Sequence, residues 1–297
     1  MVSAPQFRFT TVTGYFQQDD PATDPETFDY AESNFGLIPQ DYEQDLGIDQ
    51  HGSQWQRFNA HIQRLNSANE TKKLKVLFLG RHGEGVHNVA ERKYGTKAWD
   101  DYWSLLDGDE DGNWVDARLT EQGKCQAQLA HAAWEQQIKA GIPSPESYYV
   151  SPLNRCLETA QITFQGLSMA GTDPFKPTIK ELLRETMGQH TCDRRSLASD
   201  IAKEYPDYLF EASFSEEDRL WDPKIRESNE ERNERLRCLL NDIFASDESS
   251  YVSLTAHSGA ITSILEVVGH RRFALATGAV IPVLVSVEVV DAASQLL

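Results

Sequence analysis

The chain has 297 residues, 40% of them hydrophobic and 10% aromatic, so it is long enough to bury a sizeable core. Its formal net charge is −18. A chain this acidic argues against binding to nucleic acid or to an anionic membrane, because both need a basic face. An anionic substrate would need a locally basic site.

Residues 1–73 form a polar, acidic first segment that contains many turn-forming residues. Between Arg8 and Arg57 there are ten acidic residues and no Lys or Arg. The segment also holds several aromatic residues, which is too many for a simple disordered tail. We expect an ordered extension packed on the core. Residues 53–68 carry apolar side chains at the i, i+3 and i+7 spacing of an amphipathic helix.

Beyond the extension, short apolar runs alternate with helical patterns. This alternation predicts an α/β fold with a mostly parallel sheet, in one domain over 1–297. Residues 189–235 are charged and irregular, and they resemble a cap inserted over a site. The expected strands are 73–80, 146–150, 178–185, 250–256 and 279–291, and the expected helices are 119–141, 152–167, 233–246 and 258–269.

Nothing in the sequence points to export or to a membrane. The four cysteines form no CxxC pair, which is typical of reduced thiols inside a cell. The start of the chain lacks the apolar core of a signal peptide, and the apolar stretch near the end is too short to span a bilayer. We expect a cytoplasmic location, with a nuclear one also open.

Polar side chains follow several of the expected strands. They are Arg81 and His82, then Ser151 with Arg155, then Glu185, then His257. In open α/β sheets, ligands bind beyond the carboxyl ends of the strands. We therefore expect these groups to converge.

Familiar glycine-rich and zinc motifs do not fit the segment around His82. No Gly-Lys-Ser/Thr follows, so it is not a P-loop, and Asn88 stands where a dinucleotide fingerprint needs its third glycine. His82 and His87 are five residues apart and lack the HExxH spacing. A zinc site formed by His82, His87 and His257 is a less favoured alternative.

The residue types at the strand ends suit phosphoryl transfer. Arginines hold a tetrahedral dianion through bidentate hydrogen bonds. Arg155 lies near the start of a helix, where free N–H groups also favour anions. A neutral imidazole can then attack the phosphorus in line. Such a site needs no metal or cofactor, and its partner is a small phosphorylated substrate.

Five segments in order resemble the histidine phosphatase superfamily, which includes the cofactor-dependent phosphoglycerate mutases. They are GRHGEGVHN, LTEQGKCQA, VSPLNRCLETA, LLRETMG and LTAHSGAI, over roughly residues 74–290. The acidic extension and the stretch RETMGQHTCDRRS are most similar to fungal phosphomutase-like proteins. The resemblance implies a three-layer α/β/α sandwich with a mostly parallel central sheet.

The resemblance also implies roles for individual residues. His82 would be the nucleophile, Glu185 the general acid and then base, and His257 a further catalytic residue. The phosphate-binding set would be Arg81, His82, Asn88, Arg155 and His257. Glu181 and Glu84 are rival carboxylates; Glu181 could be a solvated strand residue, and Glu84 could hold local structure.

The sequence departs from the mutases at two places. Gly85 stands where the mutase motif has a serine, so one phosphate contact is missing. In place of the mutases' second basic cluster there are Arg194 and Arg195, with His190 nearby, as candidates for binding a second anionic group of the substrate. We expect a phosphatase that hydrolyses a phosphate monoester. The alternatives are a phosphomutase and a catalytically silent binding protein, and the oligomeric state is not predicted.

Overall fold

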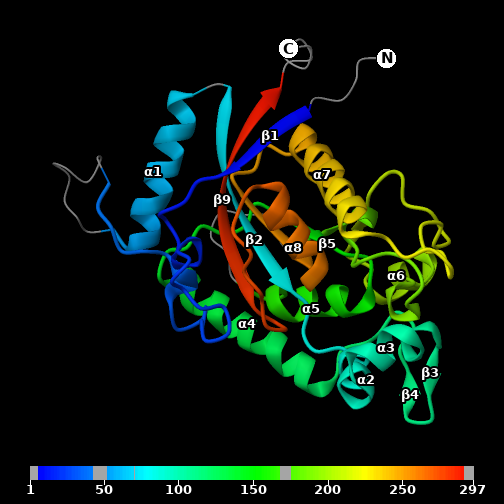
Figure 1. Cartoon of the computed structure of the whole chain (residues 1–297). Coiled ribbons are helices and arrows are strands. Elements are labelled where there is room, and N and C mark those ends of the chain that lie inside the picture. Colours follow the sequence, from blue (N-terminus) through cyan, green and yellow to red (C-terminus); the bar gives the residue numbers. More distant parts are fainter. Residues whose placement is uncertain (1–5, 43–51, 70, 168–174, 291–297) are drawn as a thin grey trace.

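A computed structural model describes residues 6–42, 52–69, 71–167 and 175–290 of the chain. A mixed seven-stranded sheet forms its centre, in the strand order β1-β9-β2-β8-β5-β6-β7 (Figure 1). Five neighbouring strands, from β2 to β7 in that order, run parallel. β9 runs antiparallel to both of its neighbours. The three-layer α/β/α architecture is confirmed.

The strands and helices have these bounds. The sheet consists of β1 (Gln6–Thr11), β2 (Lys72–Arg81), β5 (Ser147–Val150), β6 (Thr178–Ile179), β7 (Leu209–Phe210), β8 (Tyr251–Ala256) and β9 (Val280–Val290). β3 (Gly108–Asp109) and β4 (Gly112–Asn113) form a separate hairpin. The helices are α1 (Gln54–Ala68), α2 (Val86–Tyr94), α3 (Thr96–Asp101), α4 (Glu121–Lys139), α5 (Asn154–Phe164), α6 (Ala198–Glu204), α7 (Asn229–Ser246) and α8 (Ser258–Val267).

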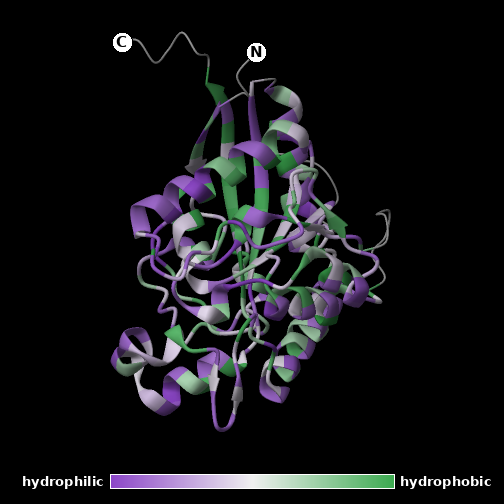
Figure 2. Cartoon of the chain, turned by 90° about the vertical axis from the view of Figure 1, so that its right-hand side faces the viewer, coloured by the Kyte–Doolittle hydropathy of each residue, from purple (hydrophilic) through white to green (hydrophobic). Residues whose placement is uncertain are grey.

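Alternate side chains of β2 enter different cores, as the two-residue period of a strand requires. Leu77 and Leu79 pack with apolar residues of α7 and α8. Val76 and Phe78 pack with apolar residues of α1 and α4 on the opposite face. The strands are therefore buried on both sides, and Figure 2 shows the sheet as a hydrophobic interior between more polar helices.

The described part of the first segment packs onto this sheet. β1 adds an edge strand by pairing antiparallel with β9. Phe16 and Phe35 are fully buried in the same cluster as Trp55 and Phe58 of α1. The acidic residues Glu43, Asp45 and Asp49 lie outside the described residues.

Side-chain caps define where the predicted helices begin. The Ser53 hydroxyl accepts a hydrogen bond from the Gln56 N–H at the start of α1. The Thr120 hydroxyl accepts one from the Gly123 N–H at the start of α4. Such caps satisfy N–H groups that have no partner within the helix. The helix predictions at 53–68 and 119–141 are confirmed.

Two sequence-based expectations need correction. The strand expected over 178–185 ends at Ile179, and Glu181–Leu183 form a 3-10 helix instead. The cap region 189–235 is not irregular throughout, since it contains α6, β7 and the start of α7. The sequence reading also missed α2, α3 and the β3–β4 hairpin between residues 86 and 113.

Candidate active site

The carboxyl ends of β2, β8 and β5 lie side by side, because these strands are hydrogen-bonded neighbours. His82 follows β2, Ser151 follows β5 and His257 follows β8. The ring centroids of His82 and His257 are 5.1 Å apart, with the rings edge to face. The sheet thus brings together two histidines that are far apart in sequence.

A backbone carbonyl fixes the tautomer of His82. Nδ1 lies 2.7 Å from the Gly83 carbonyl oxygen. A carbonyl oxygen only accepts, so Nδ1 must carry the proton in the neutral ring. Nε2 then keeps a free lone pair, which is the state that a nucleophile requires.

The surroundings of His82 keep the ring neutral. The side chain is almost completely buried. Burial and the nearby guanidinium groups of Arg155 and Arg81 lower the pKa of His82 well below its usual 6.5. At neutral pH the imidazole is therefore uncharged.

Arg155, in the first turn of α5, is buried against the same pair of rings. Its Nε donates to Nδ1 of His257 at 3.2 Å, and its terminal nitrogens donate to the Cys192 carbonyl at 2.7 Å and to Asp193 at 2.9 Å. A guanidinium has five N–H donors, so two remain for a ligand. Asp193 also pairs with Arg226 at 3.0 Å.

Arg81, at the end of β2, is held by a backbone contact and keeps donors free. One terminal nitrogen donates to the Leu275 carbonyl at 2.6 Å. Its Nε is buried and has no partner among the described residues. An unsatisfied buried donor is costly, so the guanidinium is suited to receive an anion.

His257 is committed to neighbours inside the protein. Its Nδ1 accepts from Arg155, which leaves Nε2 to donate to the Ser151 hydroxyl at 2.7 Å. Burial and the charge of Arg155 lower the pKa of His257 well below 6.5. His257 therefore lies beside the nucleophile and orients Arg155.

Asn88 and Glu84 organise the turn between β2 and α2. The Asn88 side chain accepts from the Gly85 N–H at 2.9 Å and closes the first turn of α2. Glu84 pairs with Arg92 and accepts from the Thr120 hydroxyl at 2.7 Å. Glu84 thus holds local structure.

The two remaining carboxylates have different surroundings. Glu185 is half-buried and accepts from the N–H groups of Thr186 at 2.9 Å and Gly259 at 3.0 Å, at the start of α8 next to His257. Glu181 binds the guanidinium groups of Arg184 and Arg195. Glu181 is therefore an ion-paired residue of a 3-10 helix, and the expectation of a solvated strand residue was wrong.

Arg194, Arg195 and His190 do not form one cluster of free cations. All five donors of Arg195 are engaged by Glu181 and by groups of residues 196 and 215–217, and its side chain is fully buried. The predicted substrate contact of Arg195 is therefore at odds with its surroundings. Arg194 is partly exposed, over the ring of Trp221. The half-buried His190 has its pKa lowered by burial and by Arg226.

One grouping of metal-ligand types occurs among the described residues, at His190, Cys192 and Asp193. Asp193 already neutralises Arg155 and Arg226, which disfavours a cation there. The alternative of three zinc-binding histidines, His82, His87 and His257, does not form such a grouping within the described part of the chain.

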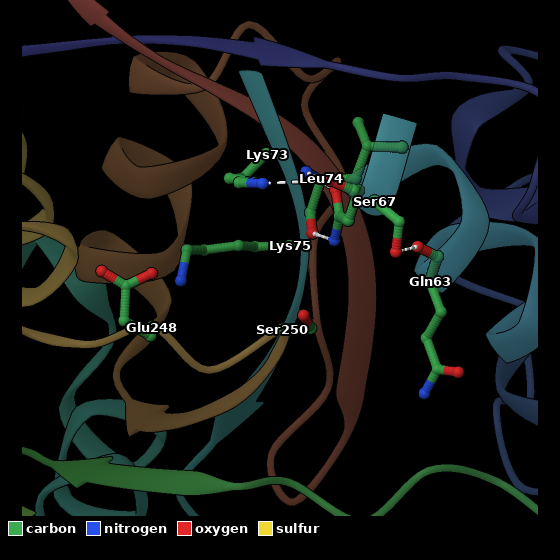
Figure 3. A pocket seen from close by; sticks show the side chains of 8 residues that line it. Gln63, Ser67, Lys73, Leu74, Lys75, Glu248 and Ser250 are labelled. Carbon is green, nitrogen blue, oxygen red and sulfur yellow. Dashed lines mark hydrogen bonds between the residues drawn. The ribbon is translucent and has the colours of Figure 1, made fainter. Parts of the chain in front are cut away.

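A separate cavity of about 490 Å³ lies near the opposite end of β2, lined by Lys73, Leu74 and Lys75 (Figure 3). Leu74 precedes His82 by eight residues, which is roughly 26 Å along a strand. Both lysines already donate to backbone carbonyls. This cavity is not part of the site.

Sequence reasoning missed two groups in the site. Asp193 belongs to the HTCDRRS stretch, whose basic residues are the ones that the sequence predicts to contact substrate. The sequence offers a role for His87 only as a zinc ligand, yet the centroid of its ring lies 5.6 Å from that of His82. The position of His87 directly after the GRHGEGV segment is the sequence feature that could have indicated its place in the site.

This α/β sandwich has two histidines and two arginines beside the carboxyl ends of its strands, an arrangement that suits phosphoryl transfer. Residues 106–286 match the model of the histidine phosphatase superfamily (branch 1). The matched range begins after His82, but relatives cover that segment as well. The chain is 56% identical to a probable phosphoglycerate mutase of Arthroderma benhamiae, over 96% of this chain and 86% of that one.

A second relative is the phosphomutase-like protein 3 of Candida albicans, 36% identical over 95% of this chain and 81% of that one. The chain belongs to the histidine phosphatase superfamily, whose members suggest phosphatase or mutase activity. Among solved structures, a phosphoglycerate mutase from Thermus thermophilus aligns with a TM-score of 0.38 at 22% identity, over 73% of this chain and 99% of that one. No helix among the described residues is long and apolar enough to cross a membrane.

Proposed function

We propose that the protein hydrolyses a phosphate monoester through a phosphohistidine intermediate on His82. The observation that carries the proposal is the hydrogen bond from Nδ1 of His82 to the Gly83 carbonyl. It leaves the Nε2 lone pair free in a ring that burial and two arginines keep uncharged. A nucleophile of this kind is ready without prior loss of a proton.

In the first step, the Nε2 lone pair forms a bond to phosphorus while the ester P–O bond breaks. Arg81 and Arg155 neutralise the phosphoryl oxygens with their remaining donors, and Asn88 adds a further contact. His257 holds Nε of Arg155 in place. The leaving oxygen takes a proton from Glu185.

In the second step, water attacks the phosphohistidine. Glu185 takes a proton from that water, the N–P bond breaks, and phosphate leaves with His82 restored. Proton transfer of this kind contributes about 10²–10⁴-fold. The position of Glu185 beside Gly259 and His257 supports this role.

The substrate is a small phosphorylated molecule, and Arg194 and His190 are proposed to contact its non-reacting part. Both belong to the cap and have exposed surface. Arg195 is left out of this proposal because its donors are already used. None of the steps proposed here uses a metal ion.

Phosphomutase activity is the second candidate, because the Arthroderma benhamiae relative is named a probable phosphoglycerate mutase. A mutase would return the phosphoryl group from His82 to a bound acceptor. The two reactions share their first step and differ in what receives the phosphoryl group from His82.

The test uses a panel of phosphomonoesters, including sugar phosphates, nucleotides, phosphoglycerates and an aryl phosphate. We expect release of free phosphate, and a phosphorylated protein trapped by rapid quenching and located at His82 by mass spectrometry. His82→Ala should fold and lose both signals. Full turnover in His82→Ala would overturn the nucleophile assignment, and transfer to an acceptor without free phosphate would replace the phosphatase with a mutase.

A further inference from the structure

His87, in the first turn of α2, is a buried polar side chain beside the nucleophile that the proposed mechanism leaves unused. Its ring centroid lies 5.6 Å from that of His82, and the residue is 8% exposed. Its Nδ1 is buried without a hydrogen-bond partner among the described residues. Such an atom is costly to leave unsatisfied, so it calls for an explanation.

The backbone next to His87 is shaped to admit its ring. A Cβ atom on Gly85 would lie 2.6 Å from Nδ1 and 2.7 Å from Cε1 of His87. Contacts this short are not tolerated, so any side chain at position 85 would displace the ring. The absence of a side chain at Gly85 and the position of the His87 ring therefore belong together.

The electrostatic setting of His87 is that of the phosphoryl site. Its pKa is lowered well below 6.5 by burial first, and then by Arg155, His82 and Arg81. These are the groups around the proposed phosphohistidine. A neutral imidazole presents one N–H donor, and an incoming dianion supplies acceptor oxygens for it.

We infer that His87 is a further phosphoryl-binding residue, whose ring N–H donates to an oxygen of the phosphoryl group that His82 attacks. The inference rests on the proposed function for the identity of the ligand. In this arrangement the ring contributes a hydrogen bond without adding a positive charge. The positive charge that faces the dianion then comes from Arg81 and Arg155, and Asp193 balances part of the charge of Arg155.

The test is calorimetric binding of inorganic phosphate, which does not depend on turnover. His87→Phe keeps a ring of similar size and removes both nitrogens, so we expect about 10- to 100-fold weaker phosphate binding, as for loss of one hydrogen bond to a charged group. His87→Asn and His87→Gln each provide a side-chain N–H donor near the position of one of the two ring nitrogens. At least one of them should recover part of the affinity.

The control variant is His131→Phe, because the His131 ring donates to the Thr163 carbonyl, on the α4–α5 contact away from the site. We expect phosphate binding in this variant to equal that of the unaltered protein. Gly85→Ala should weaken binding by displacing the ring. Added to His87→Ala, it should weaken binding no further.

Two results would overturn the inference. One is a folded His87→Phe variant whose phosphate affinity is within twofold of that of the unaltered protein. If His87→Phe does not fold, the same result in both His87→Asn and His87→Ala would overturn the inference. The other is the absence of any phosphate binding by the unaltered protein. Failure of the proposed function has a different signature, namely normal phosphate binding that depends on His87 without ester turnover or trapped phosphohistidine.

Discussion

At the scale of single residues, the site depends on which nitrogen of His82 carries the proton. The Gly83 carbonyl places that proton on Nδ1, and burial together with the charge of Arg155 lowers the pKa for binding a second proton. The same arginines that would attract a dianion therefore keep the nucleophile reactive. Charge selection and nucleophile activation come from one arrangement of side chains.

Glu185 and Glu181 lie four residues apart, and their surroundings predict opposite phenotypes. Glu185→Gln removes the proposed proton donor and keeps the side-chain shape. We expect kcat to fall by about 10²–10⁴-fold for alkyl phosphates, whose leaving oxygen needs a proton. An activated aryl phosphate should lose far less. Steady-state kinetics on both substrates gives the ratio, and an equal loss on both would point to another acid.

Glu181→Gln is the matched control, because Glu181 binds the buried guanidinium groups of Arg184 and Arg195. Removing one partner of a buried ion pair costs about 3–5 kcal/mol, and Asp218 still pairs with Arg184. We therefore expect a lower free energy of unfolding in urea, by about 2–4 kcal/mol, with the dependence on the leaving group unchanged. A selective loss on alkyl phosphates in this variant would exchange the roles of the two carboxylates.

At the scale of elements, the turn after β2 and the start of α4 meet through two glycines. A Cβ on Gly83 would lie 2.3 Å from the Gly123 carbonyl oxygen. A Cβ on Gly123 would lie 2.1 Å from the Glu84 carbonyl oxygen. The neighbours at these positions are backbone atoms that cannot rotate away. The position of the nucleophile is thus linked to the capped end of α4.

This contact reverses the usual effect of replacing a helical glycine. Alanine normally stabilises a helix interior by about 1 kcal/mol relative to glycine. For Gly123→Ala we expect a lower melting temperature and at least about a tenfold loss of kcat/KM, because the turn that carries His82 must shift. Thermal unfolding and ester hydrolysis are the measurements.

Gly112→Ala is the control for this variant, because a Cβ there meets no atom within 4 Å. Its melting temperature and activity should stay close to those of the unaltered protein. If Gly123→Ala behaves like Gly112→Ala, the close approach does not position the nucleophile.

The elements that sequence reasoning found are those with a strong local signal. β2 has an unbroken apolar run, and α1 and α4 have both periodic apolar residues and a capping residue. Residues 178–185 were wrongly predicted as one strand, because their apolar residues are compatible with a strand. The buried ion pairs of Arg184 instead accompany a turn of 3-10 helix. The contact between Arg155 and Asp193 joins residues 38 positions apart. No local sequence pattern predicts such an ion pair.

At the scale of the whole molecule, charge is distributed unevenly. The chain carries a net charge of −18, yet the charged groups that lower the pKa of the proposed nucleophile are Arg155 and Arg81. Part of that positive charge is balanced by Asp193 within the fold. The net negative charge of the chain therefore coexists with arginines at the carboxyl edge of the sheet, where open α/β sheets bind ligands.

Three buried histidines, His82, His87 and His257, make the stability of the fold sensitive to acid. The pKa of each is lowered well below 6.5 in the folded chain, chiefly by burial. In the unfolded chain each titrates near 6.5. Below that pH the unfolded state binds more protons than the folded state, so stability falls as the pH falls. Above it, both states hold neutral rings and the effect vanishes.

Urea unfolding at a series of pH values from 7.5 to 5 measures this linkage. Each histidine contributes a slope approaching about 1.4 kcal/mol per pH unit once its unfolded form is protonated, so these three give about 4 kcal/mol per pH unit near pH 5.5. His190, whose pKa is also lowered by burial, adds to that slope. His87→Phe should reduce the slope by about 1.4 kcal/mol per pH unit, and it should also weaken phosphate binding. Carboxylates with lowered pKa, such as Asp193, add their share only at more acidic pH, because their ordinary pKa is 3.8. A free energy of unfolding that stays constant from pH 7.5 to 5 would mean that these rings take up protons inside the folded protein, and His82 would then lack the free lone pair on which the proposed chemistry depends.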